Sequence, residues 1–143
     1  MRRLWRDERG ISYALTALLF AFVVLPLMLL SMQLGRMVST KHALQNAADA
    51  AAEAAVAMVD VDHFRSTGDI VLSGDVYPTA QYYAQRTFAH LGAKGVTPRV
   101  TGIWVDEATN TVRVAVEARV SALFGVPVTV HAQGAARVRA FYR

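Results

Sequence analysis

The stretch ISYALTALLFAFVVLPLMLLSMQLG, residues 11–35, contains no Asp, Glu, Lys, Arg or His. As an α-helix it would extend roughly 36 Å, which is enough to cross the hydrocarbon core of a bilayer, about 30 Å thick, with some tilt. The run is apolar on every side, so burying it in a soluble protein would need a larger surrounding core than a chain of 143 residues can supply. We therefore predict a transmembrane helix over residues 11–35.

The length of this run also separates a retained anchor from a discarded signal. A secretory signal has an apolar stretch of about 7–15 residues followed by a cleavage site of small residues. Here the run is longer, and LLSMQLGRMVSTKH, residues 29–42, has no such site and continues in good helix formers. Pro26 lies inside the run, where it removes one helical hydrogen bond, and we predict a membrane kink there.

The charges that flank the run predict its orientation. Basic residues are denser before it than after it: Arg2, Arg3, Arg6 and Arg9. Because the more basic flank of a membrane helix stays in the cytoplasm, we expect the N-terminus inside and the rest of the chain outside. The predicted organisation is a cytoplasmic basic leader (1–10), a transmembrane helix (11–35) and an extracytoplasmic α+β domain (36–143).

After the run, KHALQNAADAAAEAAVAMV, residues 41–59, has helical periodicity and is rich in alanine. We expect it to continue the membrane helix. Small side chains permit close approach of another backbone, and they lie at Ala47, Ala48, Ala51, Ala52 and Ala55. This face could be a helix-packing interface with another subunit, or it could pack on the protein's own sheet; the sequence leaves both alternatives open.

The following segment predicts a loop and a second helix. Residues 60–75 are rich in turn formers, with a short strand expected around Ile70 to Leu72. Pro78 suits the first turn of a helix that ends at Gly92. Its predicted core face consists of Ala80, Tyr83, Ala84, Phe88 and Leu91.

From residue 97 the apolar residues alternate with a period of two, which predicts strands. We expect strands over 99–105, 110–123 and 126–140, joined by short loops into a three-stranded antiparallel meander, with a bulge at Gly134. The two helices after the membrane would cover the apolar face of this sheet. The predicted fold class is therefore α+β.

The sequence offers little chemistry. It has no cysteine, which excludes disulfides and thiolate metal sites, and its net charge of +4 comes from scattered basic residues rather than a nucleic-acid-binding stripe. Asp60, Asp62 and His63 are the best metal-ligand cluster, but a solvated loop explains them better. We predict no nucleic-acid partner, no cofactor and no enzyme activity.

Three stretches resemble the TadE/TadG-like proteins of tight-adherence (Flp, type IVc) pilus systems: ERGISYALTALLFAFVVLPLMLL (8–30), LGRMVSTKHALQNAADAAAEAA (34–55) and SALFGVPVTVHAQGAARV (121–138). The resemblance implies a pilin-like fold and a single-pass minor pseudopilin in the cytoplasmic (inner) membrane of a bacterium. Its partners would be lipid and other pilin-like or pilus-assembly subunits, in a hetero-oligomeric complex or filament, and it would act by packing and docking.

The resemblance also suggests processing by a leader peptidase between Gly10 and Ile11. Type IV prepilins usually carry Glu at the fifth position after that glycine, and this chain has Leu15. Without the carboxylate, which can pair with a neighbouring subunit's terminal amine, we expect a membrane-resident anchor or initiator more than a repeated filament subunit. Two other functions stay open: an accessory anchoring subunit of another membrane complex, and a membrane-tethered hydrolase that uses Asp60, Asp62 and His63.

Overall fold

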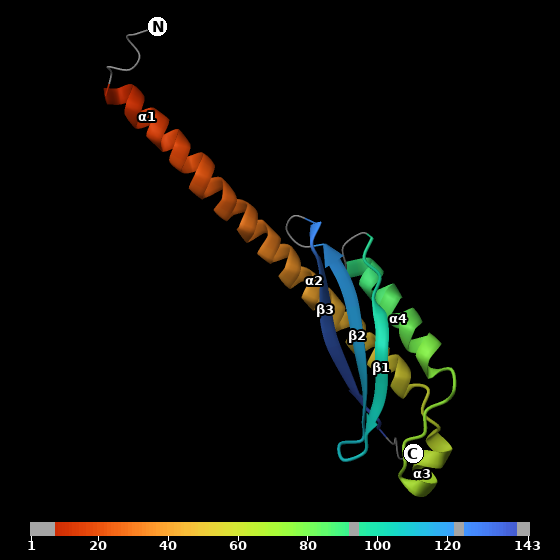
Figure 1. Cartoon of the computed structure of the whole chain (residues 1–143). Coiled ribbons are helices and arrows are strands. Elements are labelled where there is room, and N and C mark those ends of the chain that lie inside the picture. Colours follow the sequence, from red (N-terminus) through yellow and green to blue (C-terminus); the bar gives the residue numbers. More distant parts are fainter. Residues whose placement is uncertain (1–7, 92–94, 122–124, 140–143) are drawn as a thin grey trace. The chain divides into compact units, whose positions relative to one another are not determined.

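The computed structural model describes residues 8–91, 95–121 and 125–139 (Figure 1). The chain divides into two compact units, Met1–Arg36 and Met37–Arg143. The first described elements are the α-helix α1 (Glu8–Leu19), the π-helical turn η1 (Phe20–Val24) and the α-helix α2 (Leu25–Val56). They form the continuous N-terminal helix that the sequence predicts.

The remaining elements all belong to the second unit. Two helices, α3 (Val61–Thr67) and α4 (Val76–Leu91), precede three strands, β1 (Arg99–Asp106), β2 (Thr111–Ser121) and β3 (Pro127–Arg137). Adjacent strands pair antiparallel in the order β1-β2-β3. The predicted α+β fold class and the three-stranded antiparallel meander are confirmed.

Within the second unit, α2 and α4 pack on one face of this sheet (Figure 1). The core-facing row of β2 supplies Val112, Val114 and Val116, which are almost fully buried. Ala80, Ala84 and Phe88 of α4 join the same apolar cluster. Alternation along β2 follows from the two-residue period of the sequence, because successive side chains of a strand point to opposite faces.

The predicted core face of α4 is wrong at one residue. Tyr83 is 43% exposed, and its ring stacks edge-on against Tyr82, with the ring centroids 5.5 Å apart. The buried residues Ala80, Ala84 and Phe88 follow a four-residue spacing. Tyr83 lies beside this row and outside the contact between α4 and the sheet. The helix begins at Val76, so Pro78 lies in its first turn as predicted; the Leu91 side chain and Gly92 lie outside the described residues.

The predicted bulge at Gly134 is also wrong. Gly134 pairs in register with Val114, and the irregularity lies instead in β1, between Val100 and Gly102. A different constraint accounts for the glycine. A β-carbon at residue 134 would overlap the backbone carbonyl of Ala48, so Gly134 lets α2 approach β3 closely.

The segment predicted as a loop, residues 60–75, contains the helix α3. Asp60 is its N-cap, and the Asp60 carboxylate accepts hydrogen bonds from the amides of Asp62 and His63. Gly68 ends the helix in the left-handed conformation. The strand expected around Ile70 to Leu72 is reduced to an isolated bridge between Val59 and Leu72.

Two glutamines of the helices bind backbone groups in, or directly before, the outer strands. Gln81 of α4 donates to the Pro98 carbonyl and accepts from the Val100 amide, both at 2.8 Å. Gln45 of α2 donates to the Gln133 carbonyl of β3 at 2.7 Å. Because β1 and β3 are the outer strands of the described sheet, these side chains occupy backbone groups at positions where another chain could otherwise pair.

Candidate functional site

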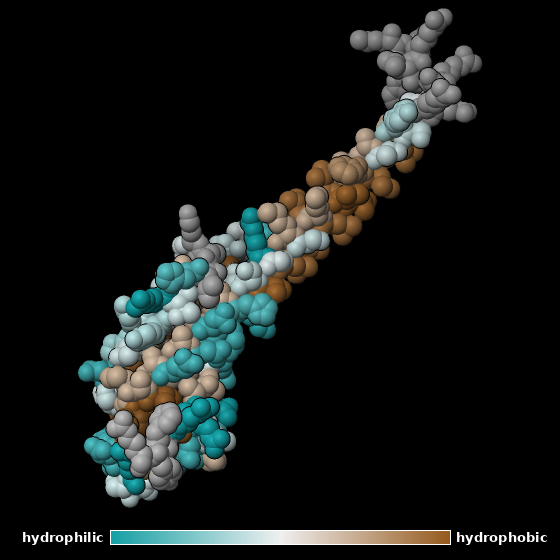
Figure 2. Space-filling model, turned by 180° about the vertical axis from the view of Figure 1, so that it is seen from behind, coloured by the Kyte–Doolittle hydropathy of each residue, from teal (hydrophilic) through white to brown (hydrophobic). Residues whose placement is uncertain are grey.

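The apolar segment of the first unit has no protein cover. Every described residue from Gly10 to Met32 is exposed, and Figure 2 shows a nearly continuous hydrophobic surface along this segment. Among the described residues, one helix, Gly10–Val56, is long and apolar enough to cross a membrane. Exposed leucine and phenylalanine side chains of this density need lipid or another apolar partner, because water solvates them poorly.

Two hydroxyl groups within this segment are hydrogen-bonded to the helix itself. Thr16 donates to the Ser12 carbonyl and Ser31 donates to the Leu27 carbonyl, each at 2.9 Å. In a hydrocarbon environment an unpaired hydroxyl would be costly, and bonding to the carbonyl four residues earlier removes that cost. Thr16 and Ser31 are therefore compatible with a lipid environment.

Pro26 lies directly after a local irregularity of this helix. The π-helical turn η1 (Phe20–Val24) ends where the Leu25 amide donates to the Phe20 carbonyl, five residues back. Proline has no amide hydrogen, and its ring would clash with a carbonyl four residues earlier in a regular α-helix. The widened turn next to Pro26 leaves room for the proline ring. Prolines and π-helical turns are both recognised causes of helix irregularity.

The predicted processing site lies within a helix. Gly10 and Ile11 are both in α1 and both exposed, so the bond between them is accessible to solvent or membrane at this end of the first unit. Leu15, in place of a glutamate, lies one turn further and is 63% exposed. Residues 1–7 of the predicted leader lie outside the described residues, and cleavage after Gly10 stays a prediction.

The five alanines of the candidate packing interface lie inside the second unit. Ala47, Ala48, Ala51, Ala52 and Ala55 are all fully buried, in one cluster with the core-facing valines of β2. Of the two alternatives that the sequence left open, the structure therefore describes packing on the protein's own sheet. Contact of the same alanines with another subunit stays a prediction, and it would require the sheet to leave this face.

Comparison with known families gives a match, and it falls on this helical region. Residues 10–58 match the family described as putative Flp pilus-assembly TadE/G-like. These residues are therefore similar to the TadE/G-like family. No curated protein and no solved structure gives a significant match to the chain.

The TadE/G-like match covers most of α1, all of η1 and α2, and ends at Met58, before α3. Two of the three stretches on which the resemblance rests, 8–30 and 34–55, fall almost entirely within it. The third, 121–138, lies beyond it, in the region of β3. The matched region therefore includes both the exposed apolar segment and the buried alanine face.

Asp60, the first residue of the weak metal-ligand candidate Asp60, Asp62 and His63, has a structural role at the start of α3. Asp60 uses its carboxylate as the N-cap, bonded to the Asp62 and His63 amides at 3.1 and 3.0 Å. No group of three or more His, Cys, Asp or Glu side chains is arranged to hold a metal among the residues that the structure describes. Helix capping is thus a sufficient explanation for Asp60.

Asp106 and Arg113 form an ion pair at the tight connection of β1 and β2. The Arg113 guanidinium donates to the Asp106 carboxylate at 2.9 Å. Hydrogen bonding by the Thr109 side chain, followed by the bond and charge of Arg113, holds the pKa of Asp106 below its usual value. This pair stabilises the turn at the end of the second unit.

Sequence reasoning missed the pairing role of Gln45 and Gln81. Gln45 belongs to a polar stripe of the alanine-rich helix, and Gln81 lies between apolar residues of α4. The sequence did contain a signal: each glutamine lies three residues before a buried alanine of its helix, Ala48 or Ala84, so it borders the helix–sheet contact.

Proposed function

We propose that this protein is a single-pass membrane subunit of a tight-adherence (Flp) pilus system, of the minor pseudopilin kind, which acts by packing and docking rather than by catalysis. The observation that carries the proposal is the TadE/G-like match over residues 10–58, which includes the whole exposed apolar segment. An apolar helix without protein cover supplies a membrane anchor, and the α+β unit after it supplies a docking body.

We further propose the cytoplasmic membrane of a bacterium as its location, with residues 1–10 inside, 11–35 spanning and 36–143 outside. The excess of arginine before the apolar run supports this orientation, because basic flanks are retained in the cytoplasm. The intrahelical bonds of Thr16 and Ser31 support a lipid environment for the span. Pilin-like and pilus-assembly subunits are the expected partners, with the exposed side chains of the span as one contact surface.

Leu15 supports a resident role within that system. A carboxylate in lipid is stable only when it is paired, and pairing with a terminal amine of a neighbour would favour ordered insertion into a filament. An exposed leucine packs with lipid as readily as with a subunit. We therefore propose an anchor or initiator of pilus assembly as the specific role.

The decisive experiment purifies the tagged full chain from the membranes of its source bacterium and analyses its mass and partners. Carbonate-resistant membrane association together with co-purified pilus-assembly subunits is the expected result. An intact mass that retains residues 1–10 supports the resident role, whereas loss of those residues supports processing between Gly10 and Ile11. Extraction by carbonate refutes the membrane anchor, and a stable complex free of pilus-assembly subunits refutes the pilus role in favour of an accessory subunit of another complex.

A further inference from the structure

An apolar groove lies at one end of the second unit, where the sheet extends past the buried core. It has a volume of about 200 Å³. One wall belongs to the part of α2 that directly follows the apolar segment, and the other belongs to the ends of β2 and β3. The lining residues are Met37, Val38, Thr40, Lys41, Val120, Val128 and Val130.

The groove exists because the core-facing row of the sheet is not covered along its whole length. Val120 and Val128 pair across β2 and β3 at the end of this row. The other core-facing residues of β2, from Val112 to Ala118, are almost fully buried. In contrast, Val128 of β3 is 38% exposed, and Val126, just before β3, is 57% exposed. Together with the apolar groove, these valine side chains leave a contiguous apolar surface that a ligand could cover.

The position of the groove along α2 indicates what meets it. The charge-free run ends at Gly35, and at about 1.5 Å per residue Lys41 lies roughly 9 Å further along the helix. Each headgroup layer is roughly 5–8 Å thick, the difference between a bilayer's full thickness and its hydrocarbon core. If residues 11–35 span the membrane, as proposed above, Met37 to Lys41 traverse the headgroup layer and emerge from it.

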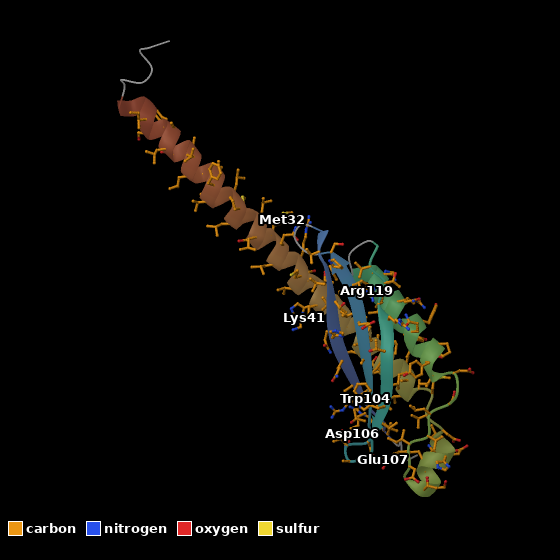
Figure 3. The ribbon with its side chains drawn as sticks, in the orientation of Figure 1. Met32, Lys41, Trp104, Asp106, Glu107 and Arg119 are labelled. Atoms are coloured by element: carbon orange, nitrogen blue, oxygen red, sulfur yellow. The ribbon has the colours of Figure 1, made fainter. Side chains whose placement is uncertain are left out.

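The charges at this end of the second unit favour a phospholipid surface. Four described Lys and Arg side chains but a single acidic one, Glu117, lie in the parts of the helices and strands at this end. The four are Lys41, Arg86, Arg99 and Arg119, and the parts are residues 37–44, 84–91, 95–101, 115–121 and 125–132. Figure 3 shows Lys41 and Arg119 toward this end, and Asp106 and Glu107 at the opposite end. Basic side chains beside an apolar groove suit a lipid phosphate above an acyl chain.

We propose that this groove binds a phospholipid of the extracytoplasmic leaflet, with the first carbons of an acyl chain against Val128, at the end of the groove nearest the span, and the headgroup phosphate facing Lys41. The proposal rests on the membrane anchor proposed above. It gives the groove a function: the second unit docks on the membrane surface, so that the sheet takes a defined orientation for its partners.

The test uses the absence of native cysteine, since any introduced cysteine is the single labelling site. The full chain carrying Val128→Cys is labelled with a small environment-sensitive fluorophore and reconstituted into phosphatidylcholine–phosphatidylglycerol vesicles that contain a lipid with a shallow acyl-chain quencher. Thr129→Cys is the matched control, because the neighbouring residue of a strand points to the opposite face of the sheet. We expect quenching at residue 128 to be at least about twofold stronger than at residue 129, as expected for side chains on opposite faces.

A label on Leu30→Cys reports insertion of the span and separates the two proposals. Quenching at residue 30 without preferential quenching at residue 128 overturns lipid docking and leaves the anchor in place. No quenching at residue 30 overturns the membrane anchor itself. If residue 128 is shielded from aqueous reagents but insensitive to the lipid quencher, and the shielding disappears at low protein-to-lipid ratio, the occupant is a second copy and the lipid proposal is wrong.

Lys41→Glu tests the headgroup contact independently of the cysteine substitution at the groove. With phosphatidylglycerol present, this change should abolish the preference for quenching at residue 128, while Arg137→Glu, at the other end of β3, should leave it unchanged. Equal quenching in the Lys41→Glu and unsubstituted backgrounds overturns the assignment of Lys41 to the phosphate.

Discussion

Gly134 of β3 lies directly against the carbonyl of Ala48 on α2, so close that a β-carbon at residue 134 would overlap it. This contact fixes how near the alanine-rich helix lies to the sheet. It requires small residues on both sides: glycine on the strand, and alanine on the helix. The alanine face and the glycine are thus two halves of one packing arrangement.

Gly134→Ala should therefore destabilise the second unit strongly. The added methyl group meets backbone rather than a mobile side chain, so the helix or the strand must shift, and we expect a loss of about 3 kcal/mol in the free energy of unfolding, at the upper end for overpacking. Chemical unfolding of the full chain in detergent, followed by circular dichroism, measures it. Gly74→Ala is the control, because nothing lies within 4 Å of a β-carbon there; equal losses at both positions would contradict the close-contact explanation.

Gln81→Ala should weaken the start of β1. The substitution removes two hydrogen bonds at 2.8 Å, to the Pro98 carbonyl and from the Val100 amide, and each is worth about 1 kcal/mol net. We expect a loss of about 2 kcal/mol in unfolding free energy and faster hydrogen exchange at the Val100 amide. Gln85→Ala, on the exposed side of the same helix, is the matched control. Unchanged exchange at Val100 would show that Gln81 does not hold the strand.

These contacts show where the sequence was informative and where it was not. The membrane-length run, the two-residue alternation of β2 and the proline at the start of α4 are local patterns, so they predicted elements without knowledge of the fold. Gly134 was mispredicted as a bulge because its role depends on Ala48, 86 residues earlier in the chain. Likewise, Gln81 binds Pro98 and Val100, and no local sequence pattern predicts such a contact.

The candidate site divides in the same way. The exposed segment 10–32 follows from composition alone, and the alanine face from helical periodicity. The sequence could not choose between an assembly face and a core face, because both need small residues at the same spacing. The groove beside Val128 was not predicted, because it depends on how far along α2 the helix packs against the sheet.

Asp106→Asn should reduce stability in a pH-dependent manner. The folded pKa of Asp106 is depressed by Thr109 and Arg113, so the ionised carboxylate stabilises the fold above its unfolded pKa, near 3.9, and this contribution is lost as the pH falls through the folded pKa. The difference in unfolding midpoint between Asp106→Asn and the unsubstituted protein should therefore be present at pH 7 and vanish in strong acid. High salt should shrink it at pH 7, because the ion pair is solvent-accessible. A difference that is constant from pH 7 to pH 2 would contradict the electrostatic origin.

Ala51→Leu distinguishes the two roles that an alanine face can have. In the structure Ala51 is fully buried against the sheet, so three additional carbon atoms must overpack the core. We expect a loss of about 1–3 kcal/mol in unfolding free energy, with membrane insertion intact because the span is unchanged. Ala57→Leu, at an exposed position just after the same helix, should cost much less. Both variants are compared by chemical unfolding and by co-purification of partner subunits. Weakened co-purification of Ala51→Leu at unchanged stability would show that the alanines contact another subunit and that the sheet leaves this face in the assembled state; lost stability with partners retained at low temperature would assign the face to the core alone.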